Sequence, residues 1–338
     1  MKALQYTTVG SRPELVEVPR PVPGPGEILL KVTAAGACHS DEFIMAAPEG
    51  AFALPLILGH EGAGIVAELG PGTTGVEVGE AVLVYGPWGC GRCYACAQGK
   101  ENNCEKGIKA PGIMRDGAMA EYMIVDDVRH LAPLGDLDPV ASASLTDAAL
   151  TPYHAIKPSV GTLVPGTTAV VIGAGGLGHV AIQILRAMTS ATIIALDVSD
   201  QKRDLAVKVG AHHALPSNTD SIALIKDLTG GRGADVIFDF VGIQPTVDLA
   251  QQLVRIEGEI VLVGVAAGAL PVGYLNLPFD VSARVVNWGS RSELLEVVEL
   301  ARTGAIHIET ETFTLENAAE AYKKLHEGTL AGRAVIVP

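Results

Sequence analysis

The hydrophobic pattern of the chain changes near residue 150. Before that point, apolar residues stand in short runs broken by glycine and proline, as at residues 27–34, 65–69 and 81–85. No helical period shows before about residue 140, so the pattern predicts a mainly β unit. After residue 150, apolar strand-length runs alternate with helical patterns. This alternation predicts an α/β unit with a doubly wound parallel sheet covered on both faces.

The second unit is predicted to end before the chain does. Its sheet has its strands by residue 265, so we expect the remaining segments to return to the first unit. The sequence therefore predicts domains at 1–152 with 289–338, and at 153–288. We expect strands at 168–172, 192–196, 235–240 and 259–265, helices at 179–188, 202–209, 222–228, 247–256, 293–301 and 316–326, and a closing strand at 333–337.

A glycine-rich loop follows the first strand of the second unit. Gly173 allows a tight turn, Gly175 lets the backbone approach a pyrophosphate, and Gly178 lets helix and strand pack closely. Asp197 ends the next strand, where it accepts hydrogen bonds from a ribose and repels a 2′-phosphate, which favours NAD over NADP. A glycine-rich turn in another doubly wound fold is the alternative. Further expected cofactor residues lie in the loop and at the carboxyl ends of other strands: Gly176, Leu177, Val241, Gly264 and Val265.

Four of the five cysteines fall within fifteen residues. Cys90, Cys93, Cys96 and Cys104 have the spacing C-x2-C-x2-C-x7-C, and four thiolates close a tetrahedral shell around zinc. Such a site is structural because no coordination position stays open. An iron–sulfur cluster or free thiols are the alternatives, although the spacing fits neither common ferredoxin pattern.

The fifth cysteine lies in a second chemically rich stretch. Residues 36–41 bring together Cys38, His39, Ser40 and Asp41 just past a strand-like run. A thiol, a hydroxyl and a carboxylate so close together suit a metal site that also moves protons. An ordinary polar turn after a strand is the alternative interpretation.

Composition narrows the possible partners. The formal charge of −14 argues against nucleic acid or an anionic membrane surface. The N-terminus lacks a signal-type apolar core, and no apolar stretch of spanning length is free of glycine or charge. In a reducing compartment, clustered cysteines are typical of metal binding rather than of disulfides. We therefore expect a soluble cytoplasmic protein.

Taken together, the Cys-His region, the four-cysteine lobe and the dinucleotide loop resemble the zinc-containing medium-chain alcohol dehydrogenases over essentially the whole chain. Residues 38–41, 58–61 and 145–147 and the segment around Trp288 are most similar to bacterial NAD-dependent secondary alcohol dehydrogenases. The resemblance implies a Rossmann NAD-binding domain and a GroES-like catalytic domain with a zinc lobe at 86–107. It also implies two zinc ions per chain and a homotetramer or homodimer.

By this resemblance Cys38, His60 and Asp147 are ligands of a catalytic zinc. The family's usual set has two cysteines and one histidine. Here no second cysteine is left, so the resemblance implies a carboxylate in its place. Glu61 is the rival of Asp147 for this role, and otherwise lies behind the ligands with Asp41.

The resemblance also implies roles for residues around the metal. It places His39 and Arg333 near the cofactor pyrophosphate, Lys202 near the adenosine ribose, and Ser40 as the proton carrier. Phe43, Phe52 and Trp288 are expected to line an apolar substrate pocket, although each could be plain core.

The expected activity is hydride transfer between NAD(H) and a secondary alcohol or ketone, with primary alcohols or aldehydes as further substrates. A zinc polyol or sugar dehydrogenase is the nearest alternative, but its pocket would need polar groups to hold several hydroxyls. A non-catalytic NAD-binding relative is a second alternative, and the presence of all three expected zinc ligands argues against it.

Overall fold

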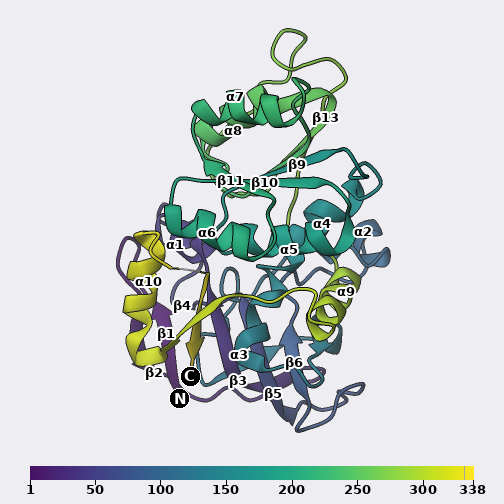
Figure 1. Cartoon of the computed structure of the whole chain (residues 1–338). Coiled ribbons are helices and arrows are strands. Elements are labelled where there is room, and N and C mark those ends of the chain that lie inside the picture. Colours follow the sequence, from purple (N-terminus) through teal and green to yellow (C-terminus); the bar gives the residue numbers. More distant parts are fainter. Residues whose placement is uncertain (331) are drawn as a thin grey trace. The chain divides into compact units, whose positions relative to one another are not determined.

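The computed structural model describes residues 1–330 and 332–338. The chain forms two compact units (Figure 1). Unit 1 comprises Met1–Leu150, Gly289–Gly304 and Ile308–Pro338, and unit 2 comprises Thr151–Trp288 and Ala305–His307. The chain thus leaves the first unit after Leu150, returns at Gly289, and passes through the second unit again for three residues, Ala305–His307.

Unit 2 is built on a parallel sheet. Within residues 151–288, all of them described, six strands lie in the order β11-β10-β9-β12-β13-β14. Every residue of β9 is buried, as expected for a strand covered on both faces. Figure 1 shows α5 and α6 on one face of the sheet and α7 and α8 on the other. The strands are β9 (Thr168–Ile172), β10 (Thr192–Asp197), β11 (His213–Pro216), β12 (Ala234–Asp239), β13 (Val254–Leu262) and β14 (Ser282–Val285), and the helices are α4 (Leu150–Ile156), η4 (Lys157–Ser159), α5 (Gly178–Met188), α6 (Asp200–Lys208), α7 (Asp220–Leu228) and α8 (Gln244–Leu253).

This strand order confirms the predicted doubly wound fold. The chain runs outward from β9 through β10 and β11, then crosses to β12 and continues through β13 to β14. The order reverses between β9 and β12, and ligands of such sheets bind at the carboxyl ends of the strands at this point.

The pattern missed or misplaced some elements of unit 2. The edge strands β11 and β14 were not predicted, because an edge strand is only half covered and carries a weak apolar signal. The helix predicted to reach residue 256 ends at Leu253, and β13 starts directly at Val254 rather than at residue 259. Val254 pairs with Ala234 of β12, so tertiary pairing ends the helix at a point that local periodicity does not mark.

Unit 1 is mainly antiparallel. In its described part, one sheet has the order β15-β16-β3-β5-β6-β8, with β7 paired to β3, and a smaller sheet has the order β2-β1-β4. The strands are β1 (Lys2–Tyr6), β2 (Glu14–Glu17), β3 (Ile28–Ala37), β4 (Leu56–Ile57), β5 (Glu61–Leu69), β6 (Ala81–Val84), β7 (Tyr122–Val125), β8 (Leu131–Pro133), β15 (Thr310–Thr314) and β16 (Arg333–Val337). The helices are α1 (His39–Met45), α2 (Tyr94–Ala97), η1 (Glu101–Asn103), η2 (Val128–His130), α3 (Pro139–Ser142), η3 (Ala143–Thr146), α9 (Arg291–Arg302), η5 (Leu315–Asn317) and α10 (Ala318–His326).

Three neighbouring strands of the larger sheet, β16, β3 and β5, bring together residues that are far apart in the sequence. β3 is antiparallel to both β5 and β16, with Gly36 opposite Glu61 on one side and Val335 on the other. The carboxyl end of β3 therefore meets the amino ends of β5 and β16. Cys38, Glu61 and Arg333 lie at these ends, so sheet register gathers them at one edge.

Helix α1 corrects the prediction that the first 140 residues lack helices. β3 continues to Ala37, beyond the predicted end at residue 34, and α1 begins at His39 with Cys38 as its N-cap residue. The Asp41 carboxylate accepts a hydrogen bond from the Cys38 backbone N–H (3.0 Å). This capping starts a helix of seven residues, which is too short to show a periodic signal.

Candidate active site

Four buried side chains converge in unit 1. Cys38, His60, Glu61 and Asp147 each offer one ligand atom, and these atoms lie within 4.8 Å of one another. Cys38 caps α1, His60 and Glu61 stand at the start of β5, and Asp147 follows η3. The set combines a sulfur, an imidazole and carboxylates, which are the three ligand types that zinc takes in proteins.

The spacing of three of these atoms fits a tetrahedral zinc. Bonds of about 2.0–2.3 Å to zinc put neighbouring ligand atoms about 3.3–3.8 Å apart. Cys38 Sγ lies 3.8 Å from Asp147 Oδ2, and His60 Nε2 lies 3.6 Å from the same oxygen. The residues present therefore fit the metal that the sequence predicts.

Asp41 lies behind the imidazole. Its Oδ1 is 3.3 Å from His60 Nδ1, and its carboxylate is fully buried. Burial alone would lower the pKa of His60, but hydrogen bonding with Asp147 and Asp41 and the neighbouring Cys38 raise it well above its ordinary value. Asp41 thus faces the ring nitrogen opposite to the one nearest Asp147, as in carboxylate–histidine–zinc sites.

Arg333 and Glu61 form a buried ion pair at this centre. Arg333 Nε donates to Glu61 Oε2 (3.1 Å), a second bond joins its Nη2 to Glu61 Oε1, and Nη2 also donates to Asp147 Oδ2 (3.3 Å). Burial raises the pKa of Glu61, although the Arg333 charge opposes the rise. The Arg333 side chain is only 3% exposed, and its guanidinium donates to the metal-site carboxylates of Glu61 and Asp147. Its expected contact with the cofactor pyrophosphate stays a prediction.

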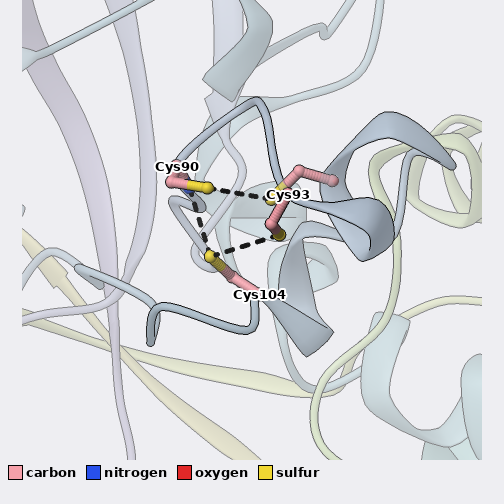
Figure 2. A group of neighbouring side chains, drawn as sticks. Cys90, Cys93 and Cys104 are labelled. Carbon is pink, nitrogen blue, oxygen red and sulfur yellow. Dashed lines mark hydrogen bonds between the residues drawn. The ribbon is translucent and has the colours of Figure 1, made fainter.

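The four remaining cysteines form a separate cluster. Their sulfurs lie within 4.8 Å of one another, with 4.0 Å between Cys90 and Cys96 and 3.9 Å between Cys93 and Cys104. Figure 2 shows Cys90, Cys93 and Cys104 converging beside α2. These separations are near the tetrahedral edge for zinc–sulfur bonds and far from a disulfide bond of about 2.05 Å. None of the five cysteines forms a disulfide, and the four clustered sulfurs converge as a zinc site requires, so the prediction of a four-cysteine metal cluster is confirmed.

The glycine-rich loop of unit 2 has the predicted form. Gly173 has a positive φ of 86°, and a Cβ on Gly178 would lie 1.8 Å from the Gly173 carbonyl oxygen. Asp197 closes the loop, since Oδ2 accepts a hydrogen bond from Ala174 N (2.8 Å) and Oδ1 accepts one from Ser199 N (2.9 Å). The loop leads into the amino end of α5, where free backbone N–H groups favour a phosphate. The structure therefore offers a cradle for a dinucleotide.

Other expected cofactor residues lie around this loop or on unit 1. Lys202 lies close to the glycine loop, since its Nζ would be 3.9 Å from a Cβ added at Gly175. Val241 packs against Gly173, and Gly264 packs against the backbone of Val241. Val265 is exposed, and on unit 1 the His39 side chain is 69% exposed. Their contacts with a cofactor stay predictions.

Sequence reasoning missed Asp239 at the end of β12. Its side chain accepts hydrogen bonds from the backbone of Val241 and Gly242 and from Thr246 Oγ1, while its carbonyl accepts from Gly264 N. Asp239 therefore holds two of the strand-end loops in place. The sequence did offer a signal for this role: Asp239 is an acidic residue at the end of an apolar strand, three residues before Gly242.

The three expected pocket residues differ in exposure. Phe43 on α1 is 56% exposed, and Phe52 packs partly buried against the core of unit 1. Trp288 belongs to unit 2, where it is buried and has a positive φ of 51°. Their role in substrate binding stays a prediction.

Comparison with known proteins agrees with this fold and with these sites. Residues 24–136 match the family described as "Alcohol dehydrogenase GroES-like domain", and residues 176–303 match "Zinc-binding dehydrogenase". A NAD-dependent alcohol dehydrogenase of Sulfurisphaera tokodaii is 35% identical, with all of both chains covered. A D-arabinose 1-dehydrogenase (NADP(+)) of Saccharolobus solfataricus is 35% identical over 94% of this chain and 92% of that protein.

A solved structure extends the likeness to three dimensions. The acetophenone reductase of Geotrichum candidum, solved in complex with NAD, superimposes with a TM-score of 0.87 at 32% identity and covers 100% of this chain and 97% of that one. Fold and metal sites together define a zinc-dependent oxidoreductase with a dinucleotide-binding unit. The chain belongs to the zinc-containing medium-chain alcohol dehydrogenase family, whose members act on CH–OH groups. In the described residues, no helix is long and apolar enough to cross a membrane.

Proposed function

We propose that this protein is an NAD-dependent zinc alcohol dehydrogenase that interconverts secondary alcohols and ketones. One observation carries the proposal: Cys38, His60 and Asp147, from three separate segments, converge at the spacing of a tetrahedral zinc. Three protein ligands leave a fourth position for a substrate oxygen, which is the mark of a catalytic zinc site.

We assign Asp147 rather than Glu61 as the third ligand. Both Glu61 oxygens are hydrogen-bonded to Arg333, whereas Asp147 receives one bond from it and lies 3.6–3.8 Å from the other two ligand atoms. Glu61 then neutralises the charge of Arg333 and lies behind the three metal ligands.

Ser40 is the proposed proton carrier. Zinc supplies the Lewis acidity that lowers the pKa of a bound alcohol, and NAD supplies the hydride acceptor. The Ser40 hydroxyl is half-buried, and its Oγ lies 3.6 Å from Cys38 Sγ. This contact with Cys38 supports a role in which the Ser40 hydroxyl accepts the alcohol proton and passes it towards solvent.

The choice of NAD over NADP rests on Asp197. Its carboxylate accepts hydrogen bonds from Ala174 N in the glycine loop and from Ser199 N just after β10, and these bonds hold the charge at the end of the strand. A fixed negative charge there repels that phosphate. The NAD-dependent relative and the reductase solved with NAD support the same choice.

A sugar dehydrogenase is the second candidate function. The arabinose dehydrogenase relative favours it, and the acetophenone reductase favours ketones. Phe43, Phe52 and Leu54 beside the metal-ligand segments are apolar and offer no partners for several hydroxyls. We therefore give preference to simple secondary alcohols.

Metal analysis and a substrate panel test the proposal. We expect two zinc ions per chain, and faster turnover of 2-butanol and aryl ketones than of D-arabinose or sorbitol, with NAD(H) preferred to NADP(H). Faster turnover of D-arabinose would establish the sugar dehydrogenase instead. One zinc per chain together with no turnover of any alcohol would indicate a non-catalytic relative.

Two further assignments belong to this proposal. We propose a homodimer or homotetramer, supported by the exposed edge strand β14 and by exposed Val272, Tyr274 and Leu275 before it. We also propose a cytoplasmic protein, supported by the five free thiols. Sedimentation analysis tests the oligomer.

A further inference from the structure

Asp41 holds two of the proposed metal ligands at once. Its Oδ1 lies 3.3 Å from His60 Nδ1, and its Oδ2 accepts the backbone N–H of Cys38 (3.0 Å). A fully buried carboxylate needs such donors, because an ion out of water is costly unless its oxygens are paired. The position of Cys38 and the orientation of His60 therefore both depend on this one carboxylate.

A second hydrogen-bond donor reaches Asp41 Oδ2 from the far end of the chain. The Tyr322 hydroxyl lies 3.1 Å from Asp41 Oδ2 and 3.1 Å from Met119 Sδ. A phenol has one proton, and a carboxylate is a much stronger acceptor than a thioether. Burial and the Asp41 charge raise the pKa of Tyr322 well above its ordinary value, so it stays a donor. The hydroxyl therefore donates to Asp41.

Helix α10 fixes this tyrosine. Ala318, Ala321, Tyr322 and Leu325 form its buried face, at the spacing of one side of a helix. Tyr322 also lines a surface cavity of about 340 Å³ with Arg12 and Met45, whereas Asp41 is not among the lining residues. Tyr322 thus borders the cavity while Asp41 is fully buried, and a Phe would keep the aromatic ring that fills this position.

We infer that Tyr322 is a positioning residue for the catalytic metal: it acts through Asp41 on both Cys38 and His60 and so slows the loss of zinc. The inference rests on the metal site of the proposed function. Removing the hydroxyl takes one of the two hydrogen-bond donors of Asp41 Oδ2, which weakens the hold of this buried carboxylate on Cys38 and, through Oδ1, on His60. Loss of a partner that contacts a metal ligand directly costs 10–100-fold in metal affinity, so one step further out we expect about 3–10-fold.

The test is the rate at which zinc passes from the holoenzyme to a colorimetric chelator. Zinc release should show two phases, and the phase missing in Cys38→Ser belongs to the catalytic site. We expect Tyr322→Phe to accelerate that phase about 3–10-fold and to leave the phase of the four-cysteine cluster unchanged. Tyr6→Phe is the matched control, because Tyr6 is also buried in the same core, but its hydroxyl donates to Met45 O and accepts from Gly10 N.

The results of these measurements distinguish a failure of the Tyr322 inference from a failure of the proposed function. In an Asp41→Asn background, Tyr322→Phe should have no further effect on zinc release, because the residue through which it acts has changed. Equal catalytic-site release from Tyr322→Phe and Tyr6→Phe overturns the inference, as does equal acceleration of both phases, which indicates a general loss of stability. A wild-type protein that holds zinc only in the four-cysteine cluster overturns the proposed function itself.

Discussion

Gly36→Ala is the substitution that tests the geometry of the metal centre most directly. Gly36 lies in β3 opposite Glu61, and an added Cβ would sit 1.8 Å from Glu61 Oε2 and 2.4 Å from Ser144 Oγ. Separations this short are impossible. The Glu61 side chain would have to move, but it is fully buried and bonded to Arg333. The new methyl group and the ion pair therefore compete for the same space.

The loss of stability depends on whether the Glu61–Arg333 ion pair breaks. Separating a buried ion pair costs about 3–5 kcal/mol, because one charge is left without its partner. Accommodating the methyl group in a packed interior costs about 1–3 kcal/mol if the pair survives by small shifts. We expect the first case and a loss of at least about 3 kcal/mol. In a domain of 150–250 residues this corresponds to a fall in Tm of roughly 6–12 °C.

Thermal unfolding of the zinc-loaded protein measures this effect. Gly161→Ala is the matched control, because a Cβ there meets no atom within 4 Å and φ is not positive. That change should be neutral or stabilising by about 0.4–1 kcal/mol. If Gly36→Ala melts within about 2 °C of Gly161→Ala, the space at Gly36 is not what keeps the Glu61–Arg333 pair in place, and the reasoning fails.

Three further changes probe the other sites. Asp197→Gly should weaken NADH binding about tenfold and relax the exclusion of NADPH, measured by fluorescence titration; unchanged selectivity would place specificity elsewhere. Cys104→Ser should reduce bound zinc from two ions per chain to one, and two ions would contradict the cluster. His130→Phe should cost about 2–3 kcal/mol near pH 6, because Asp126 and Glu101 lose the buried cation between them and keep only their partly exposed partners Arg115 and Arg129. Burial lowers the pKa of His130, but the two carboxylates raise it overall, so this cost should be largest below about pH 6.5 and shrink as the pH rises through the folded-state pKa. A pH-independent difference in denaturant unfolding would contradict it.

Two of the sites could be predicted from the sequence because their residues are close together in the chain. The spacing of Cys90, Cys93, Cys96 and Cys104 defines a tetrahedral shell by itself, and these sulfurs do lie within 4.8 Å of one another. The glycine loop is equally local, since its strand, turn and helix follow directly in sequence. Short-range geometry leaves few ways to arrange such segments.

The elements that the sequence pattern did not predict are either short or lie at the edge of a sheet, where one side of the strand is uncovered. Helix α1 has seven residues, and β11 and β14 lie at the two edges of their sheet. The boundary between α8 and β13 is set by pairing with β12 rather than by any residue within the segment. Periodicity cannot report a boundary that a neighbouring strand imposes.

The sequence alone determined the fold class, the four-cysteine cluster and the dinucleotide loop, because each depends on neighbours in the chain. Only the tertiary structure decided that Arg333 pairs with Glu61 and that Tyr322 reaches Asp41, contacts that span 272 and 281 positions. Such pairs form because antiparallel register brings the ends of β3, β5 and β16 to one edge and because the buried face of α10 packs into the core of unit 1, to which the helix belongs. No local pattern encodes that register; it follows from how the whole sheet buries its apolar residues.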